Sequence, residues 1–158
     1  MSEFEEYEYI SPTDKPALLA LSSMETLANV QTICLELGYK VHVASNHEDF
    51  TKRFNAINYQ LVVVEEHFAC ASVDTNETLR LIQIMPMNKR RHCCFLLLGD
   101  RLQTMNPLVA WQQSVHGVVG KQDFGSLGQI ISKVTGDNDM FLNTFREVLD
   151  AMAKGELH

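Results

Sequence analysis

Long hydrophobic runs are absent from this sequence. No apolar stretch approaches the roughly 18 consecutive residues that a membrane-spanning helix needs. Residues 1–9, MSEFEEYEY, are acidic, whereas a signal peptide begins with basic residues and continues with apolar ones. We therefore expect a cytoplasmic protein with no membrane partner.

Basic residues are also few. The formal net charge is −7, and the longest basic run is the short stretch Lys89–Arg91. A surface that binds the phosphate backbone needs clustered positive charge. We therefore expect no nucleic-acid partner.

Cysteine pairs with a recognisable spacing are missing as well. None of the four cysteines, at positions 34, 70, 93 and 94, belongs to a CxxC motif. An HxxC at His67–Cys70 and the run His92–Cys94 offer an alternative, a soft metal site across two strand ends. Because no second paired spacing supports that site, we favour reduced, mostly buried thiols and expect no metal.

Glycine patterns typical of enzymes and cofactor sites do not occur. There is no Walker loop, no dinucleotide-binding pattern and no nucleophile elbow, since GSLG at residues 125–128 has the wrong context. Ser22, Ser23 and Thr26 could cradle a phosphate at a helix start, but the glycine that such loops need is missing, so a capping serine is favoured. We expect no catalytic residues and no cofactor, hence no enzyme.

The sequence does contain a regular alternation of short apolar runs and helical patterns, in a chain of 158 residues that is 46% hydrophobic and long enough for one packed domain. The expected strands cover residues 17–21, 39–45, 59–64, 92–99 and 115–121. The expected helices cover residues 24–38, 46–58, 77–89, 106–114 and 124–134, and Pro86 kinks or ends the third of them. Asn46 and Asn106 are expected as N-terminal caps and Gly38 as a C-terminal cap.

Strands that look buried on both faces and alternate with helices predict a parallel sheet covered by helices on both sides. The expected domain is a doubly wound α/β unit over residues 17–134. Residues 1–16 are expected to be an acidic tail or linker, because Pro16 cannot donate a hydrogen bond to a sheet.

Beyond Gly136, an additional helix is expected over residues 137–155. It places Phe141, Phe145, Val148 and Met152 on one stripe. The stripe either covers an edge of the domain or pairs with a second copy of the chain, and we favour self-association.

Two strand ends resemble motifs of the receiver domains of two-component response regulators. YQLVVVEEHF, residues 59–68, looks like the third strand of a receiver, which ends in the aspartate that accepts a phosphoryl group, and Glu65 holds that position. VVGKQDF, residues 118–124, looks like the fifth strand with its lysine, Lys121. The resemblance covers about residues 17–134 and implies a flavodoxin-like fold with strand order 2-1-3-4-5.

The chain departs from the receiver pattern at several of its marker positions. Ser22 and Ser23 replace the acidic pair that helps to hold magnesium, and Gly99 replaces the hydroxyl residue at the end of the fourth strand. Val118 stands at the aromatic switch position, and Gln122 replaces the proline that commonly follows the lysine.

These departures imply a degenerate, phosphorylation-independent receiver in which Glu65, Lys121, Ser22, Ser23 and Gly99 form a vestigial acceptor site. Magnesium needs hard oxygen ligands in near-octahedral array, and one glutamate with two serines makes a poor set. We expect Glu65 to form a permanent ion pair with Lys121 and Glu66 to point to solvent or to cap the loop.

The predicted function is a non-catalytic signalling module in or beside a bacterial two-component pathway, whose partner is a protein, including a second copy of itself. Receivers commonly bind partners through the fourth helix, the fifth strand and the fifth helix, so Trp111, Val118, Phe141 and Phe145 are the candidate partner-binding residues. For Trp111, a core-facing position is the simpler alternative.

Two other functions remain open. A working receiver of a phosphorelay would use Glu65 or another acceptor and bind magnesium near Glu65, Glu66 and Ser22. A binder of a small ligand or nucleotide would instead show an open pocket at the carboxyl ends of the strands.

Overall fold

The computed structural model describes residue 11 and residues 13–70, 75–90 and 92–155. Five parallel strands form one sheet in the order β2-β1-β3-β4-β5, which confirms the predicted fold class. The strands are β1 (Pro16–Ala20), β2 (Lys40–Val43), β3 (Leu61–Glu65), β4 (Cys94–Gly99) and β5 (Gly117–Gly120).

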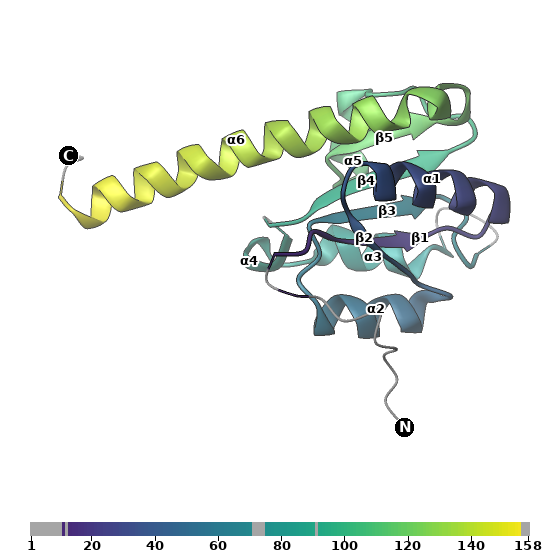
Figure 1. The fold of residues 1–158 in the computed structure, drawn as a ribbon, viewed down its shortest axis with the longest axis horizontal. Coiled ribbons are helices and arrows are strands. Elements are labelled where there is room, and N and C mark those ends of the chain that lie inside the picture. Colours follow the sequence, from purple (N-terminus) through teal and green to yellow (C-terminus); the bar gives the residue numbers. More distant parts are fainter. Residues whose placement is uncertain (1–10, 12, 71–74, 91, 156–158) are drawn as a thin grey trace.

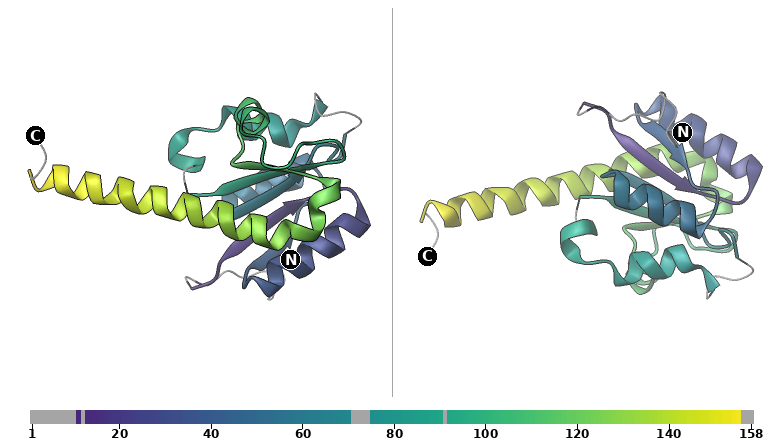
Figure 2. Two further views of the ribbon diagram at one scale, coloured as in Figure 1. Left: turned by 90° about the horizontal axis from the view of Figure 1, so that it is seen from above. Right: turned by 90° about the horizontal axis from the view of Figure 1, so that it is seen from below.

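Helices cover both faces of the sheet (Figures 1 and 2). One face carries α1 (Met24–Glu36) and α6 (Leu127–Ala153), and the other carries α2 (His47–Ala56), α3 (Glu77–Ile84) and α5 (Pro107–Gln113). The short helix α4 (Met87–Arg90) precedes β4, and a 3-10 turn, η3 (Lys121–Ser126), follows β5. Successive side chains of a strand point to opposite faces, so the sheet contributes to two hydrophobic cores, one on each face.

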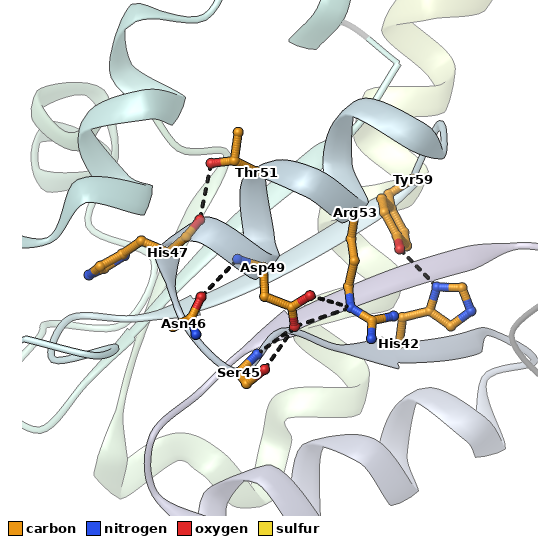
Figure 3. Close-up of polar contacts among 8 residues, drawn as sticks. All are labelled: His42, Ser45, Asn46, His47, Asp49, Thr51, Arg53 and Tyr59. Atoms are coloured by element: carbon orange, nitrogen blue, oxygen red, sulfur yellow. Dashed lines mark hydrogen bonds and ion pairs between the residues drawn. The ribbon is translucent and has the colours of Figure 1, made fainter. Parts of the chain in front are cut away.

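Polar caps fix the helix starts that the sequence predicts. Asn46 Oδ1 accepts the amide hydrogen of Asp49 at 2.8 Å, and the Asp49 carboxylate in turn accepts from the Ser45 amide at 2.9 Å (Figure 3). Arg53 pairs with Asp49 one helical turn later, at 3.1 Å. Asn106 caps α5 ahead of Pro107 as expected. These bonds satisfy amides that a helix start leaves without partners.

Two proline positions set element boundaries. Pro16 begins β1, contrary to the expectation that it belongs to a tail, because the first residue of a strand tolerates proline and its carbonyl accepts the Gln60 amide hydrogen at 2.9 Å. Pro86 ends α3: the preceding Met85 is extended, as residues before proline prefer, and α4 starts as a separate turn. Residues 1–10 of the expected tail lie outside the described residues.

The C-terminal helix differs from the sequence prediction. A separate helix over residues 137–155 was expected after a break near Gly136, but α6 runs without interruption from Leu127 to Ala153. Gly136 is exposed inside it, and Gly155, with φ of +72°, follows its end. One glycine weakens a helix without ending it when residues on both sides keep the helical period.

Gly136→Ala is expected to raise the free energy of unfolding by about 0.5–1 kcal/mol. A methyl group at this position would meet nothing within 4 Å, so the gain comes from the lower entropy of the unfolded chain. Urea unfolding of both proteins measures the difference. Gly38→Ala is the control: Gly38 has φ of +89°, so the same substitution there should destabilise. A destabilised Gly136→Ala variant would contradict an uninterrupted helix.

Candidate functional site

Glu65 lies at the carboxyl end of β3 and binds the chain that follows β1. Its Oε1 accepts the amide hydrogens of Ser22 at 3.1 Å and Ser23 at 3.3 Å. Ser23 is also the N-cap of α1, and its Oγ accepts from the Thr26 amide, as the capping interpretation predicts. A carboxylate at a helix start is stabilised by the amides there and by the helix dipole.

The expected ion pair between Glu65 and Lys121 is wrong. Lys121 is exposed at the first position of η3, and among the described residues no ion pair joins it to Glu65. The amides of Ser22 and Ser23 both bind Oε1 of the carboxylate, so a lysine across the crevice is not required to hold Glu65 in place.

Ser22 forms a hydrogen bond with the loop that follows β3. Its Oγ accepts the amide hydrogen of Ala69 at 2.8 Å, and Ala69 has φ of +51°. Asn76, which is buried, caps α3 through Oδ1 and donates from Nδ2 to the carbonyls of Glu65 and Glu66 at 3.1 and 3.2 Å. The sequence prediction did not single out Asn76, although an asparagine directly before a helix starting with glutamate is a capping signal.

Glu66 was expected to point to solvent or to cap the loop, and its side chain is instead partly buried. Its carboxyl group is half-buried over Gly99, where a Cβ on residue 99 would collide with it. Burial raises the pKa of Glu66, and the neighbouring Asp100 raises it further, while His67 lowers it. The space that a hydroxyl side chain at position 99 would use is therefore taken by Glu66.

The loop between β4 and α5 crosses the carboxyl end of β5. The amide of Met105 donates to the carbonyl of Val118 at 2.8 Å, and the amide of Gly120 donates to Thr104 Oγ1 at 3.0 Å. Thr104 Oγ1 also hydrogen-bonds to Asp123 in η3. Sequence reasoning missed Thr104 and Asp123, because nothing in the local pattern indicates the path of this loop.

Hydrogen bonds of the chain with itself thus join the loops around the carboxyl-end crevice. Three pockets in the described part of the chain lie elsewhere: beside Phe54 and Lys89, beneath α6 around Tyr39 and Leu142, and beside Trp111 and His116. A binder of a small ligand at the crevice would require an open pocket there, and none of these three pockets lies there.

The cysteine and histidine positions were the other candidates for chemistry. Cys34, Cys93 and Cys94 are buried free thiols, as predicted, and burial raises the pKa of Cys34 and of Cys94 to about 12. Cys70 Sγ donates to the carbonyl of Glu66 at 3.6 Å. Across the described ranges, no three His, Cys, Asp or Glu side chains gather as a metal site would need.

The candidate partner-binding residues divide into exposed and buried ones. Trp111 on α5 is 79% exposed, which excludes a core position, and Phe141 and Phe145 on α6 are exposed as well. Val118 is 0% exposed in the core beneath α5, so its assignment to a binding surface is wrong. A valine in the middle of a strand covered on both faces has no access to a partner.

Comparison with known proteins gives matches in structure only. No family model matches the sequence, and no curated protein matches it. A response regulator from Thermotoga maritima superposes with a TM-score of 0.61 at 15% identity, over 78% of this chain and 98% of that chain. A CheY-like response regulator receiver domain protein from Methanospirillum hungatei gives 0.63 at 12%, over 81% and 98%. The chain has the receiver fold.

A third structure matches more of the chain. NtrX from Brucella abortus superposes with a TM-score of 0.66 at 12% identity, over 92% of this chain and 31% of that chain. The unmatched 8% of this chain is fewer residues than follow Gly136, so the match includes part of α6 beyond Gly136. In the part of the chain that the structure describes, no helix combines the length and apolarity that a membrane crossing requires.

Glu65→Gln is expected to lower the free energy of unfolding by only about 0.5 kcal/mol, because the amide oxygen of glutamine still accepts from Ser22 and Ser23 and only the charge near the helix start is lost. Glu65→Ala should lower it by about 1–2 kcal/mol, because both amides lose their partner. Lys121→Met should leave it unchanged. Urea unfolding measures all three. The double variant Glu65→Gln with Lys121→Met tests for coupling. If its change in the free energy of unfolding differs from the sum of the two single changes, the two side chains do form an ion pair.

Proposed function

We propose that this chain is a receiver-like signalling module that acts through protein–protein interaction without being phosphorylated. The observation that carries the proposal is the hydrogen bonding of Glu65, whose carboxylate oxygen is engaged by the amides of Ser22 and Ser23. Phosphoryl transfer needs a carboxylate that can turn an oxygen toward the phosphorus, and the two amide hydrogen bonds to Oε1 restrain that of Glu65. In this chain, the equivalent carboxylate is part of a structural junction.

The donor groups around Glu65 do not fit a magnesium ion. Magnesium requires oxygen ligands in near-octahedral array, usually including one or two carboxylates. Here Ser22 Oγ is engaged by the Ala69 amide, and Gly99 contributes no side chain. Glutamate is also one methylene longer than aspartate, and a misplacement of about 1 Å can reduce a rate on the order of a hundredfold. We therefore place the module in or beside a cytoplasmic two-component pathway as a binding partner that needs no phosphate.

Incubation with acetyl phosphate and magnesium, followed by intact-mass spectrometry, tests the proposal. We expect no covalent phosphoryl adduct, and a receiver that keeps the acidic pair and the aspartate serves as the positive control. An adduct that forms on this chain and disappears in Glu65→Gln would overturn the proposal in favour of a working phospho-acceptor.

A further inference from the structure

One face of α6 continues from the domain into solvent. Leu127, Ile131 and Val134 on this face are buried against the sheet, and Leu142 is only 6% exposed at the edge of the sheet where the strands begin. Beyond that edge the helix projects from the domain (Figures 1 and 2). There Phe141 is 64% exposed, Val148 42% and Met152 60%. The helix thus extends an apolar face past the domain that it covers.

The spacing of this face is that of a helix–helix seam. Steps of four and three residues alternate along the whole of α6 at positions 127, 131, 134, 138, 141, 145, 148 and 152. Such a series is the a/d pattern by which α-helices pack against each other. The positions beside the seam in the projecting part, Leu142, Thr144, Leu149 and Ala151, carry no charge.

The charged residues of the projecting part lie away from the seam. Asp139, Arg146, Glu147 and Asp150 all occupy the remaining helix positions. Between residues 141 and 152 the seam and the positions beside it carry no charge. This part of the surface offers nothing to select an acidic or basic partner, but it matches a second copy of itself, as a two-fold contact requires. A projecting helix with exposed apolar residues also gains most of its stability from packing.

We propose that the partner of this module is a second copy of the chain, bound through an antiparallel two-fold pair of α6 helices; this inference rests on the proposed function and names its partner. The direction follows from the fold. The apolar stripe and the domain lie on the same face of α6, so a parallel pair would force both domains into the space between the helices. An antiparallel pair keeps the domains at opposite ends.

The side chains fit this arrangement. With the two-fold axis between residues 146 and 147, Phe145 packs on Val148 of the other copy, and Phe141 packs on Met152 of the other copy. Each large ring thus meets a smaller or more flexible side chain. The next layer would join Asn138, which faces Cys94 of its own domain, with Gly155, which follows the helix end. The seam therefore fills the length available between the domain edge and the end of the helix.

Sedimentation equilibrium of the full chain over a range of concentrations tests the pairing. We expect a dimer, and Val148→Glu should weaken its Kd by at least about a hundredfold, because the seam would bury two unpaired carboxylates. Met140→Glu is the matched control: Met140 is 70% exposed on the opposite side of the same helix, so this variant should remain dimeric. A monomeric wild-type chain, or a dimer that Val148→Glu leaves intact, would overturn the proposal.

A second variant tests the direction of the helices. Phe145→Lys combined with Val148→Glu places opposite charges in contact twice in the antiparallel pair, so dimerisation should be largely restored relative to Val148→Glu alone. A parallel pair would set like charges together, and a double variant that remains monomeric would contradict the antiparallel arrangement. Circular dichroism checks that α6 is intact in each variant. Adding acetyl phosphate separates the two proposals: a phosphorylated dimer refutes only the proposed function, and an unphosphorylated monomer refutes only the pairing.

Discussion

Gly120→Ala is expected to lower the free energy of unfolding by about 2–3 kcal/mol. A Cβ at this position would collide with the backbone carbonyl oxygen of Leu102. A flexible side chain could relieve such a collision by changing its rotamer, but a backbone atom cannot. The loop of Leu102 is held by the bond from Met105 to Val118 and by Thr104. Relief of the collision would break at least one of these contacts. Urea unfolding measures the loss.

Gly125→Ala is the matched control for this prediction. Gly125 lies in η3, close to Gly120 in sequence, but a Cβ there would meet nothing within 4 Å. It should change the free energy of unfolding by less than about 0.5 kcal/mol. A Gly120→Ala variant as stable as the Gly125→Ala variant would show that the loop over β5 is not packed as described.

Acidification from pH 6.5 to pH 4 is expected to remove about 3 kcal/mol of stability through His116. Burial, together with the nearby Arg90 guanidinium, lowers the pKa of His116 to about 4. The Nδ1 atom accepts the amide hydrogen of Phe95 at 3.0 Å, and the ring stacks on the Phe95 ring, so the fold requires the neutral imidazole. The unfolded chain binds the proton near pH 6.5, so stability is complete above that pH and is lost as the pH falls toward 4.

His116→Asn separates this histidine from the other groups that titrate. Asparagine can still accept from the Phe95 amide but does not bind a proton, so the slope of stability against pH between 6.5 and 4 should flatten. His92→Asn, at an exposed position just before β4, should keep the full slope. Chemical unfolding at a series of pH values measures both. An unchanged slope in His116→Asn would show that His116 is accessible and titrates normally.

Much of the fold could be predicted because its signals are local. The buried strands are visible in the sequence as continuous apolar runs. Ser23, Asn46 and Asn106 are small polar residues that directly precede segments of helical periodicity. The strand order came from the resemblance to receivers. The helix boundary near Gly136 was misjudged because the weak helix propensity of glycine was weighed above the seam pattern that continues through it.

The candidate site was only partly predictable. The topology brings Glu65, Ser22 and Ser23 together, since the ends of neighbouring parallel strands meet at one edge of the sheet. The predicted partner of Glu65, Lys121, is wrong. Backbone amides compete with side chains for a carboxylate, and a pattern of residue types does not show where those amides lie. The position of Glu66 over Gly99 and the path of the loop over β5 depend on tertiary packing, which no local spacing encodes.

The central claim, that Glu65 belongs to a structural junction and not to a phospho-acceptor site, is tested most directly by titration with magnesium and beryllofluoride, a mimic of a phosphorylated carboxylate. The mimic needs no chemical step, so it reports whether the site can hold a phosphoryl group at all. NMR follows the amides of Ser22, Ser23 and Gly99 and the side chain of Lys121. We predict no saturable shifts at these positions. Saturable shifts clustered at all of them would contradict the account and identify a working phosphoryl switch.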